Sequence, residues 1–201
     1  MKTRIAVLVS GGGTNLQALI DKQGSVIKSG EIVLVVSSTS KAYAIERARK
    51  ASIKTEVVAK KKIESQLEYE ERLLSCLEEN RIDLIVLAGF MRILSKSFTS
   101  RYPNRIINIH PSLIPSFSGE GYYGLKVHEA ALSYGVKVTG ATVHFVNEIP
   151  DGGAIIAQKA VPVLDGDTPE ILQRRVMEMA EWILLAEATE MVSRTILENK
   201  E

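Results

Sequence analysis

Short runs of aliphatic and β-branched residues alternate along most of the chain with segments in which apolar residues recur every three or four positions. The runs predict buried strands, and the segments predict amphipathic helices. The first helix is expected to begin near Leu16, Leu19 and Ile20. The other expected helices are residues 42–51, 67–77 and 126–134, and the expected strands are residues 5–9, 32–36, 55–59, 82–88 and 105–109.

The rhythm changes late in the chain. Residues 138–146 and 154–163 both read as strands, and only residues 147–153 separate them. Two strands joined by so short a connection form an antiparallel pair, because a parallel crossover needs a longer segment.

Residues 169–197 predict one long closing helix, with Thr168 as its N-cap and Pro169 in its first turn. Its expected buried face consists of Leu172, Val176, Met179, Ile183 and Ala186. The sequence therefore predicts an α/β fold of one domain, residues 1–201. That domain contains a single doubly wound, mostly parallel sheet with helices on both faces and an antiparallel C-terminal strand extension.

Composition narrows the choice of partners. Hydrophobic residues make up 45% of the chain and the formal net charge is +1, so no overall positive field favours nucleic acid or an anionic membrane. The basic run Lys60-Lys61-Lys62 is read as a solvated approach to a helix, and the apolar run at residues 5–9 is too short to cross a membrane. The single cysteine, Cys76, excludes an intrachain disulfide and a zinc cluster. We expect a cytoplasmic protein that acts on small molecules and holds no metal.

The glycine-rich segment at residues 10–15 is the first candidate site. It joins the first strand to the first helix, so its backbone can approach a phosphate at the positive end of the helix. The alternative is a tight turn that needs glycine for its dihedral angles. A dinucleotide fingerprint is disfavoured, because the motif beginning at Gly11 would require glycine in place of Leu16.

Two further segments carry candidate chemistry. Asn108 and His110 lie two residues apart at a strand end, so both side chains can face one substrate before Pro111 ends the strand. The alternative for His110 is an ordinary hydrogen-bonded loop histidine. Farther along, Thr142 and His144 are expected on one face of their strand, and Asp151 follows in a glycine-bracketed turn where it could serve the turn alone.

Four segments together resemble one family, the folate-dependent glycinamide ribonucleotide formyltransferases of purine synthesis. They are residues 87–94 (LAGFMRIL), 108–113 (NIHPSL), 140–146 (GATVHFV) and 151–153 (DGG). The resemblance implies transfer of a formyl group from 10-formyltetrahydrofolate to the amine of glycinamide ribonucleotide. It also implies the formyltransferase fold, no metal, and a monomer or homodimer.

Catalytic roles carry over residue by residue. Asn108 would donate a hydrogen bond to the developing oxyanion, and His110 would stabilise it as an imidazolium and act as general acid. Asp151 would pair with His110, raise its pKa and shuttle protons through an ordered water. Thr142 would organise that water, and His144 would be a supporting residue rather than the main acid.

The resemblance also assigns binding residues. The ribonucleotide would contact Gly12, Gly13, Thr14 and Asn15 through its phosphate and Glu181 through its ribose. The folate would lie against Met91, Arg92, Ile93, Leu94, Asn108 and Val146.

The sequence departs from the family pattern at several positions. Residues 117–124 are longer than the usual turn, which suggests a lid or edge loop and puts the role of His128 in doubt. A basic residue common near Gln66 is missing, so the contacts of the folate tail are open. Trp182, next to Glu181, stands where histidine is usual.

Two other functions remain open. A formyltetrahydrofolate hydrolase shares the fold, although such relatives carry an additional N-terminal domain, whereas the first strand here is expected near Arg4. A non-catalytic nucleotide-binding module would use only the glycine loop. That alternative predicts that Asn108, His110 and Asp151 lie scattered in space.

Overall fold

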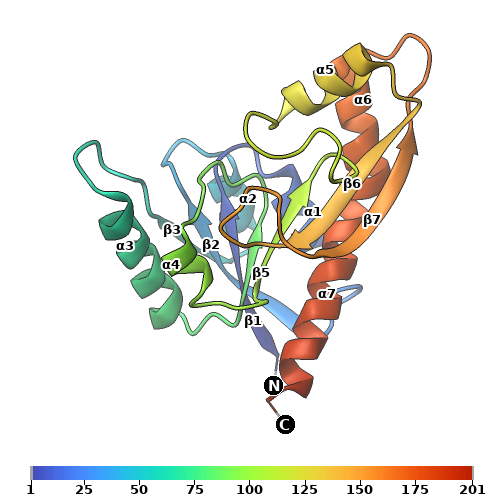
Figure 1. Ribbon diagram of the computed structural model, residues 1–201. Helices are drawn as coiled ribbons and strands as arrows, with labels where there is room; N and C mark the ends of the chain where they lie inside the picture. Colours follow the sequence, from blue (N-terminus) through green and yellow to red (C-terminus); the bar gives the residue numbers. More distant parts are fainter. Residues whose placement is uncertain (1, 201) are drawn as a thin grey trace.

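The computed structural model describes residues 2–200 and contains one seven-stranded sheet (Figure 1). The strand order is β3-β2-β1-β4-β5-β6-β7, in which β1 to β5 run parallel and β6 and β7 are antiparallel to their neighbours. The strands are β1 (Thr3–Val9), β2 (Gly30–Ser37), β3 (Lys54–Val57), β4 (Leu84–Leu87), β5 (Ile106–His110), β6 (Val138–Phe145) and β7 (Ile155–Pro162). The predicted fold class, including the antiparallel extension, is confirmed.

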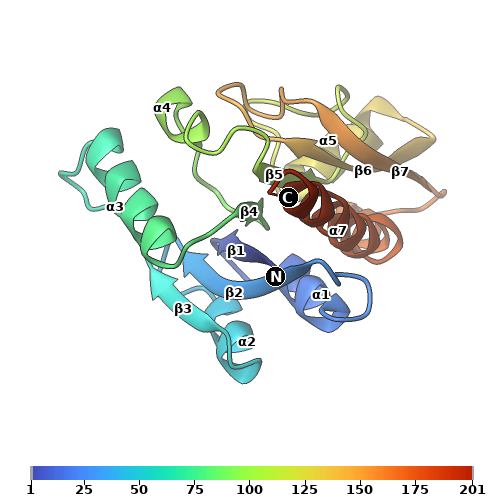
Figure 2. The same ribbon diagram turned by 90° about the horizontal axis from the view of Figure 1, so that it is seen from below.

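Helices cover both faces of this sheet. Figure 2 shows α1 (Thr14–Lys22) and α2 (Ala44–Lys50) on one side, and α3 (Gln66–Glu79) and α4 (Lys96–Thr99) on the other. The remaining helical elements are α5 (Leu125–Tyr134), α6 (Pro169–Val176), the π-helix η1 (Met177–Glu181) and α7 (Trp182–Glu198). The sequence did not predict α4, because four residues are too few to show a helical period. Among the described residues, no helix combines the length and apolar character needed to cross a membrane.

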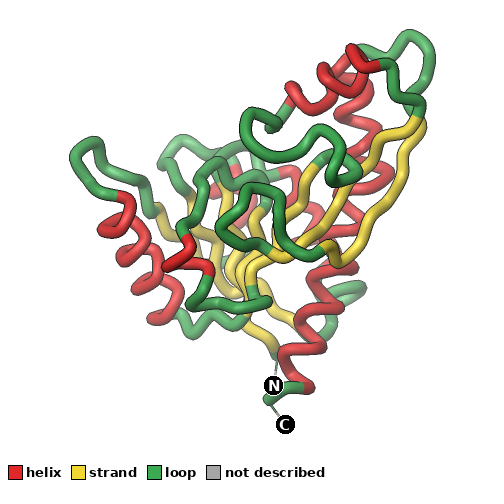
Figure 3. The backbone as a smooth tube through the Cα atoms, viewed as in Figure 1, coloured by secondary structure: helices red, strands yellow, loops and turns green. Residues whose placement is uncertain are grey.

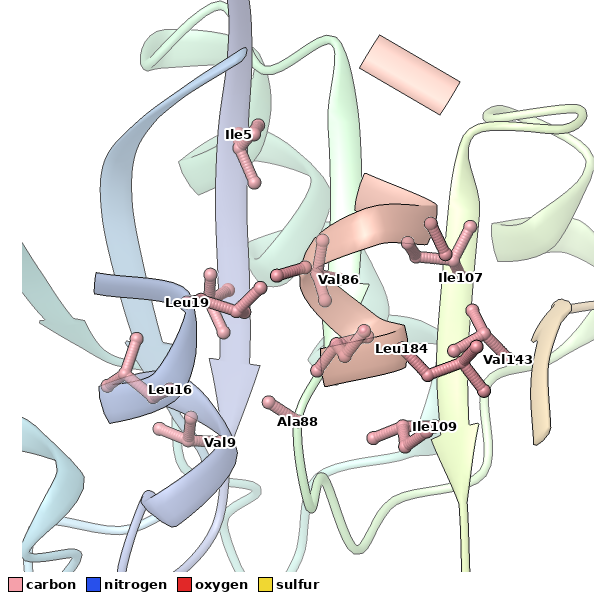
Figure 4. Close-up of a cluster of buried hydrophobic side chains, with 14 of the residues drawn as sticks. Ile5, Val9, Leu16, Leu19, Val86, Ala88, Ile107, Ile109, Val143 and Leu184 are labelled. Carbon is pink, nitrogen blue, oxygen red and sulfur yellow. The ribbon is translucent and has the colours of Figure 1, made fainter. Parts of the chain in front are cut away.

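Each face of the sheet has its own hydrophobic core. On the α1 side, Ile5 and Val9 of β1 pack with Leu16 and Leu19 of α1 and Leu184 of α7 (Figure 4). On the opposite side, a second core gathers Tyr69 and Leu73 of α3 with Phe98 of α4 and with inward-facing residues of the strands. Residues 5–9 are completely buried because both faces of β1 are covered, which explains why the run is continuously apolar.

The closing helix differs from its prediction in one respect. Thr168 caps its start as expected, accepting a hydrogen bond from the Ile171 backbone N–H at 3.3 Å, but η1 interrupts the regular helix after Val176. Buried residues include a series at every fourth position across this segment: Leu172, Val176, Ala180, Leu184 and Ala188. That spacing fits a helix with a π segment, which contains more residues per turn than an α-helix. The predicted inward position of Met179 is therefore wrong, and its side chain is 46% exposed.

Candidate active site

One cleft of about 850 Å³ opens at the carboxyl ends of β1, β4 and β5. The loops that follow these strands line it, together with the loop after β6 and one stripe of the closing helix. Figure 3 shows the loops gathered along one edge of the sheet. In the strand order β1 lies between β2 and β4, so the chain reverses its winding direction here. Open α/β sheets bind ligands at such a reversal, because the neighbouring loops separate there and leave a crevice.

Asn108 and His144 face each other across the β5–β6 pair and are joined by one side-chain hydrogen bond, whose direction the surroundings fix. His144 Nδ1 lies 2.7 Å from the Phe145 carbonyl oxygen, which can only accept, so Nδ1 carries a proton. His144 Nε2 is then an acceptor and receives a hydrogen from Asn108 Nδ2 at 3.1 Å. The second hydrogen of the Asn108 amide is free to point into the cleft.

His110 and Asp151 form the neighbouring pair. His110 Nε2 donates to the Phe117 carbonyl oxygen at 2.8 Å, so His110 Nδ1 faces Asp151 Oδ2, 3.4 Å away. Asp151 Oδ1 also lies 3.6 Å from His144 Nε2, so one carboxylate lies beside both rings. The structure thus brings Asn108, His110 and Asp151 together, which contradicts the scatter expected of a non-catalytic module.

The pKa of His110 differs from the expectation. Burial lowers the pKa of this imidazole, and although the Asp151 carboxylate and the Phe117 carbonyl raise it, the net shift is downward. Asp151 does raise the pKa of His110 as expected, but the net shift is downward because desolvation of the buried ring outweighs the charge of one carboxylate. For Asp151, burial raises the pKa, but the neighbouring His144 and His110 rings and the Gly119 N–H together lower it.

The segment that begins at Phe117 contributes backbone groups to this pair, which the sequence did not predict. The Phe117 carbonyl accepts from His110, and the Gly119 N–H donates to Asp151 Oδ2 at 2.8 Å. Gly119 needs its left-handed φ of 86° to present that N–H. Three glycines in eight residues were the available signal, since they allow the backbone to curl against the cleft.

Thr142 does not face the cleft. Its hydroxyl donates to the Ser112 carbonyl at 2.7 Å and accepts from the Ile114 N–H at 3.1 Å and from Gln158 Nε2 at 3.0 Å. A hydroxyl has one hydrogen and two lone pairs, so no capacity is left for a water in the cleft. The expectation that Thr142 organises such a water is not met, and the residue instead fixes the loop after β5.

The glycine loop forms one end of the cleft. Gly13 has a φ of 73°, and a Cβ there would lie 2.6 Å from the Cβ of Ala44. Gly13 is thus required for packing against α2, whereas a Cβ on Gly12 would meet nothing within 4 Å. Arg47 Nε donates to the Gly12 carbonyl at 2.8 Å, and the first N–H groups of α1 have no partner within the helix. The tight-turn explanation therefore applies to Gly13, whereas Gly12 has open space beside it.

Glu181 lies beside this loop because η1 turns it inward. It is buried, and its Oε2 accepts a hydrogen bond from Asn15 Nδ2 at 2.8 Å. Burial raises the pKa of this carboxyl to about 7, although the Asn15 bond lowers it. Asn15 Oδ1 is buried without a hydrogen-bond partner among the described residues, so this end of the cleft holds an unsatisfied acceptor.

The opposite end of the cleft is apolar and open. Met91 and Ile93 are 57% and 67% exposed, whereas Leu94 is buried in the α3-side core. Val146 packs against the same core from the other wall, and the Met91 N–H is held by Ser10 Oγ at 2.9 Å. Exposed apolar side chains next to a cleft indicate a site for a flat, largely apolar ligand group.

Comparison with known proteins agrees with this arrangement. A family model described as formyl transferase matches residues 3–188. The chain is 44% identical over 192 residues to the human trifunctional purine biosynthetic protein adenosine-3, which is 96% of this chain but only 18% of the human protein. It is 42% identical over 175 residues to the phosphoribosylglycinamide formyltransferase of Haemophilus influenzae, covering 88% of this chain and 80% of that protein.

Solved structures lead to the same family. The glycinamide ribonucleotide transformylase 1 of Symbiobacterium toebii superposes with a TM-score of 0.89 at 41% identity, over 96% of this chain and 89% of that one. The phosphoribosylglycinamide formyltransferase of Brucella melitensis gives a TM-score of 0.87 at 41% identity, over 96% of each chain. Because the family model spans nearly all of the sequence and the fold agrees throughout, this chain belongs to the formyl transferase family.

Proposed function

We propose that this protein transfers a formyl group from 10-formyltetrahydrofolate to the amine of glycinamide ribonucleotide, using one formyltransferase domain over residues 1–201. One observation carries the proposal: an amide donor, an imidazole and a carboxylate meet midway between a phosphate-type loop and an exposed apolar wall. The two ends of the cleft match the two substrates. The names of the relatives support the same reaction.

The ribonucleotide occupies the glycine-loop end. Its phosphate accepts hydrogen bonds from the backbone around Gly12, Gly13 and Thr14, where the α1 dipole favours an anion. Its ribose hydroxyls reach Glu181 and the unpartnered Oδ1 of Asn15. The glycinamide amine then extends toward Asn108 and His110.

The folate occupies the apolar end. Its ring system lies against Met91 and Ile93 on one wall and Val146 on the other, while backbone groups at Arg92 and Leu94 read its polar edge. Arg92 is the cation available to the glutamate tail. This placement directs the formyl group toward Asn108, which lines the same cleft.

Bond formation begins when the amine nitrogen attacks the formyl carbon, which gives a tetrahedral centre with an oxyanion. The free hydrogen of the Asn108 amide donates to that oxygen, while the hydrogen shared with His144 fixes the orientation of the amide. A donor that is already oriented stabilises the charge without reorganising, and losing one costs roughly 3–4 kcal/mol of barrier.

The attacking nitrogen must then lose a proton, and the departing folate nitrogen must gain one. Neutral His110 presents the lone pair of Nδ1 toward Asp151 Oδ2, 3.4 Å away, so the pair has room to accept one proton between them. Protonation turns the contact into an ion pair, which offsets the burial that disfavours the imidazolium in the free protein. When the carbon–nitrogen bond to the folate breaks, this proton passes to the folate nitrogen.

We also propose that the enzyme is cytoplasmic, is a monomer or homodimer, and acts on small molecules rather than on nucleic acid or a membrane. The near-neutral composition and the single cysteine support this assignment.

A coupled assay of the purified protein with both substrates tests the function. We expect formylated ribonucleotide and tetrahydrofolate in equal amounts, and no folate turnover when the amine acceptor is omitted. Release of formate at the same rate with and without the acceptor would instead establish a hydrolase. Absence of turnover in both reactions, together with ribonucleotide binding, would establish the non-catalytic module.

A further inference from the structure

His128 is the histidine that the proposed reaction leaves unused. His110 and His144 each have ring nitrogens bonded to backbone carbonyls, at 2.8 and 2.7 Å. His128 is completely buried on α5, yet neither of its ring nitrogens has a hydrogen-bond partner among the described residues. An imidazole held in this way leaves a donor and an acceptor unsatisfied, which costs free energy unless a ligand supplies both.

His128 is one of the residues that line the cleft. Gln173, Met177 and Glu181 of the closing helix also line it, and α5 packs against α6 of that helix. Figure 1 shows α5 beside α6, away from α3 and α4. Ala131, one turn beyond His128, belongs to the α1-side core, whereas Leu94 of the folate wall belongs to the core on the other face.

The chemistry of the ring selects among ligand groups. Burial, reinforced by the charge of His110, lowers the pKa of His128 to about 4, so the ring is neutral near neutral pH. A neutral imidazole offers one N–H donor and one nitrogen acceptor. A phosphate dianion only accepts and would leave the ring acceptor unpaired. Amide and hydroxyl groups offer both a donor and an acceptor.

We propose that His128 binds the ribonucleotide substrate directly, through the uncharged amide and hydroxyl groups of its ribosyl-glycinamide portion. The inference rests on the proposed function. It explains why a buried ring is left unsatisfied in the free protein: the substrate supplies its missing partners. It also makes His128 a specificity residue, because a ribose phosphate without an amide leaves part of that capacity unused.

Steady-state kinetics and thermal unfolding of His128→Leu, His128→Phe and His128→Gln test the proposal. We expect the two apolar variants to raise the KM for glycinamide ribonucleotide by about tenfold or more, since a substrate group then loses its partner. The KM for 10-formyltetrahydrofolate should stay unchanged, and His128→Gln, which retains a donor and an acceptor, should recover part of the affinity. Without substrate, His128→Leu and His128→Phe should unfold at the wild-type temperature or above, because an unsatisfied polar group has been removed.

Ser193→Ala is the matched control, because the Ser193 hydroxyl is also buried without a partner in residues 2–200 but does not line the cleft. It should leave both KM values unchanged. An unchanged ribonucleotide KM in both apolar variants, an equal rise for both substrates, or a sharply lower unfolding temperature of the free variants would each overturn the proposal. If wild-type protein transfers no formyl group, the proposed function fails, and thermal stabilisation by the ribonucleotide alone still decides whether His128 contacts it.

Discussion

The two ends of the cleft are built on different physical principles. The end that holds Glu181, His128 and Asn15 is polar: Glu181 and His128 are buried, and His128 and Asn15 hold hydrogen-bonding atoms without a partner among the described residues. The end near α4 is exposed and apolar, with Met91 and Ile93 open to solvent. A buried polar site discriminates strongly, because a wrong ligand leaves its groups unpaired. An apolar wall contributes area and tolerates variation in the ligand.

The two ends also differ in their effect on the stability of the protein without substrate. Unpaired polar atoms at the ribonucleotide end destabilise the free protein, so substrate binding should stabilise it markedly. The open apolar end does not destabilise the free protein in this way, since exposed methionine and isoleucine side chains are ordinary on a surface. The following predictions test this contrast, from the largest expected effect to the smallest.

Variants at the point where the two ends meet should affect turnover more than binding. Asn108→Ala and Asp151→Asn should each lower kcat by about 10² or more, because one removes the oxyanion donor and the other the proton acceptor. Both substrates should still bind. The coupled assay measures activity, and circular dichroism checks that the variants fold. Full activity in both variants would show that Asn108 and Asp151 do not act in catalysis.

Substitutions in the glycine loop should separate packing from phosphate binding. Gly13→Ala should destabilise the fold by roughly 2 kcal/mol or more, because the new Cβ collides with Ala44 and the left-handed φ disfavours a side chain. Gly12→Ala meets no protein atom within 4 Å, so it should leave stability intact and weaken the ribonucleotide about tenfold by obstructing phosphate approach.

Chemical denaturation measures the stability of Gly13→Ala and Gly12→Ala, and calorimetry measures their affinity for each substrate. Equal loss of folate and ribonucleotide affinity in Gly12→Ala would show that the loop does not belong to one end alone. Normal stability of Gly13→Ala would show that the structure accommodates the new Cβ beside Ala44 at little cost in free energy.

The pH dependence of stability should reveal the buried polar end directly. His128 has a pKa near 4 in the folded protein against an ordinary value of 6.5, so between these pH values the unfolded chain binds a proton that the folded protein refuses. Stability attributable to this ring is therefore present above pH 6.5 and is lost as the pH falls toward 4, by roughly 3 kcal/mol in total.

Urea unfolding of wild type and His128→Leu at pH 7.5 and pH 4.5 isolates this contribution. The wild type should lose more stability than the variant over that interval. Glu181 shifts in the opposite direction and is common to both proteins, so it cancels in the difference. Parallel losses in the two proteins would mean that His128 is protonated readily in the folded state.

The sequence predicted much of this site because strand periodicity fixes direction. Asn108 and His110 were expected on one face of a strand end, and both line the cleft beside His144. Local pattern could not predict the role of Thr142, because its partners Ser112, Ile114 and Gln158 come from distant segments. Local pattern also missed that η1 changes which residues of the closing helix face inward, since a π-turn is set by packing rather than by the period of the helix.

The same reasoning explains why the sequence did not predict the backbone groups at the site. A carbonyl such as that of Phe117 carries no side-chain signature, yet it determines which nitrogen of His110 bears the proton. The direction of the His110 pKa shift likewise depends on burial, which requires coordinates. Motifs thus identify side chains, whereas the structure shows their partners and their dielectric surroundings.

The smallest effect is expected at the open apolar end. Met91→Ser should raise the KM for 10-formyltetrahydrofolate only a few-fold, about 1 kcal/mol, because a side chain that is already 57% exposed contributes part of its area to the ligand. The ribonucleotide KM should not change. Met191→Ser is the matched control, since Met191 is comparably exposed, at 46%, but lies on α7 and does not line the cleft. A loss at Met91 as large as that at His128 would mean that the apolar wall discriminates as strongly as the polar end, and the contrast between the two ends would fail.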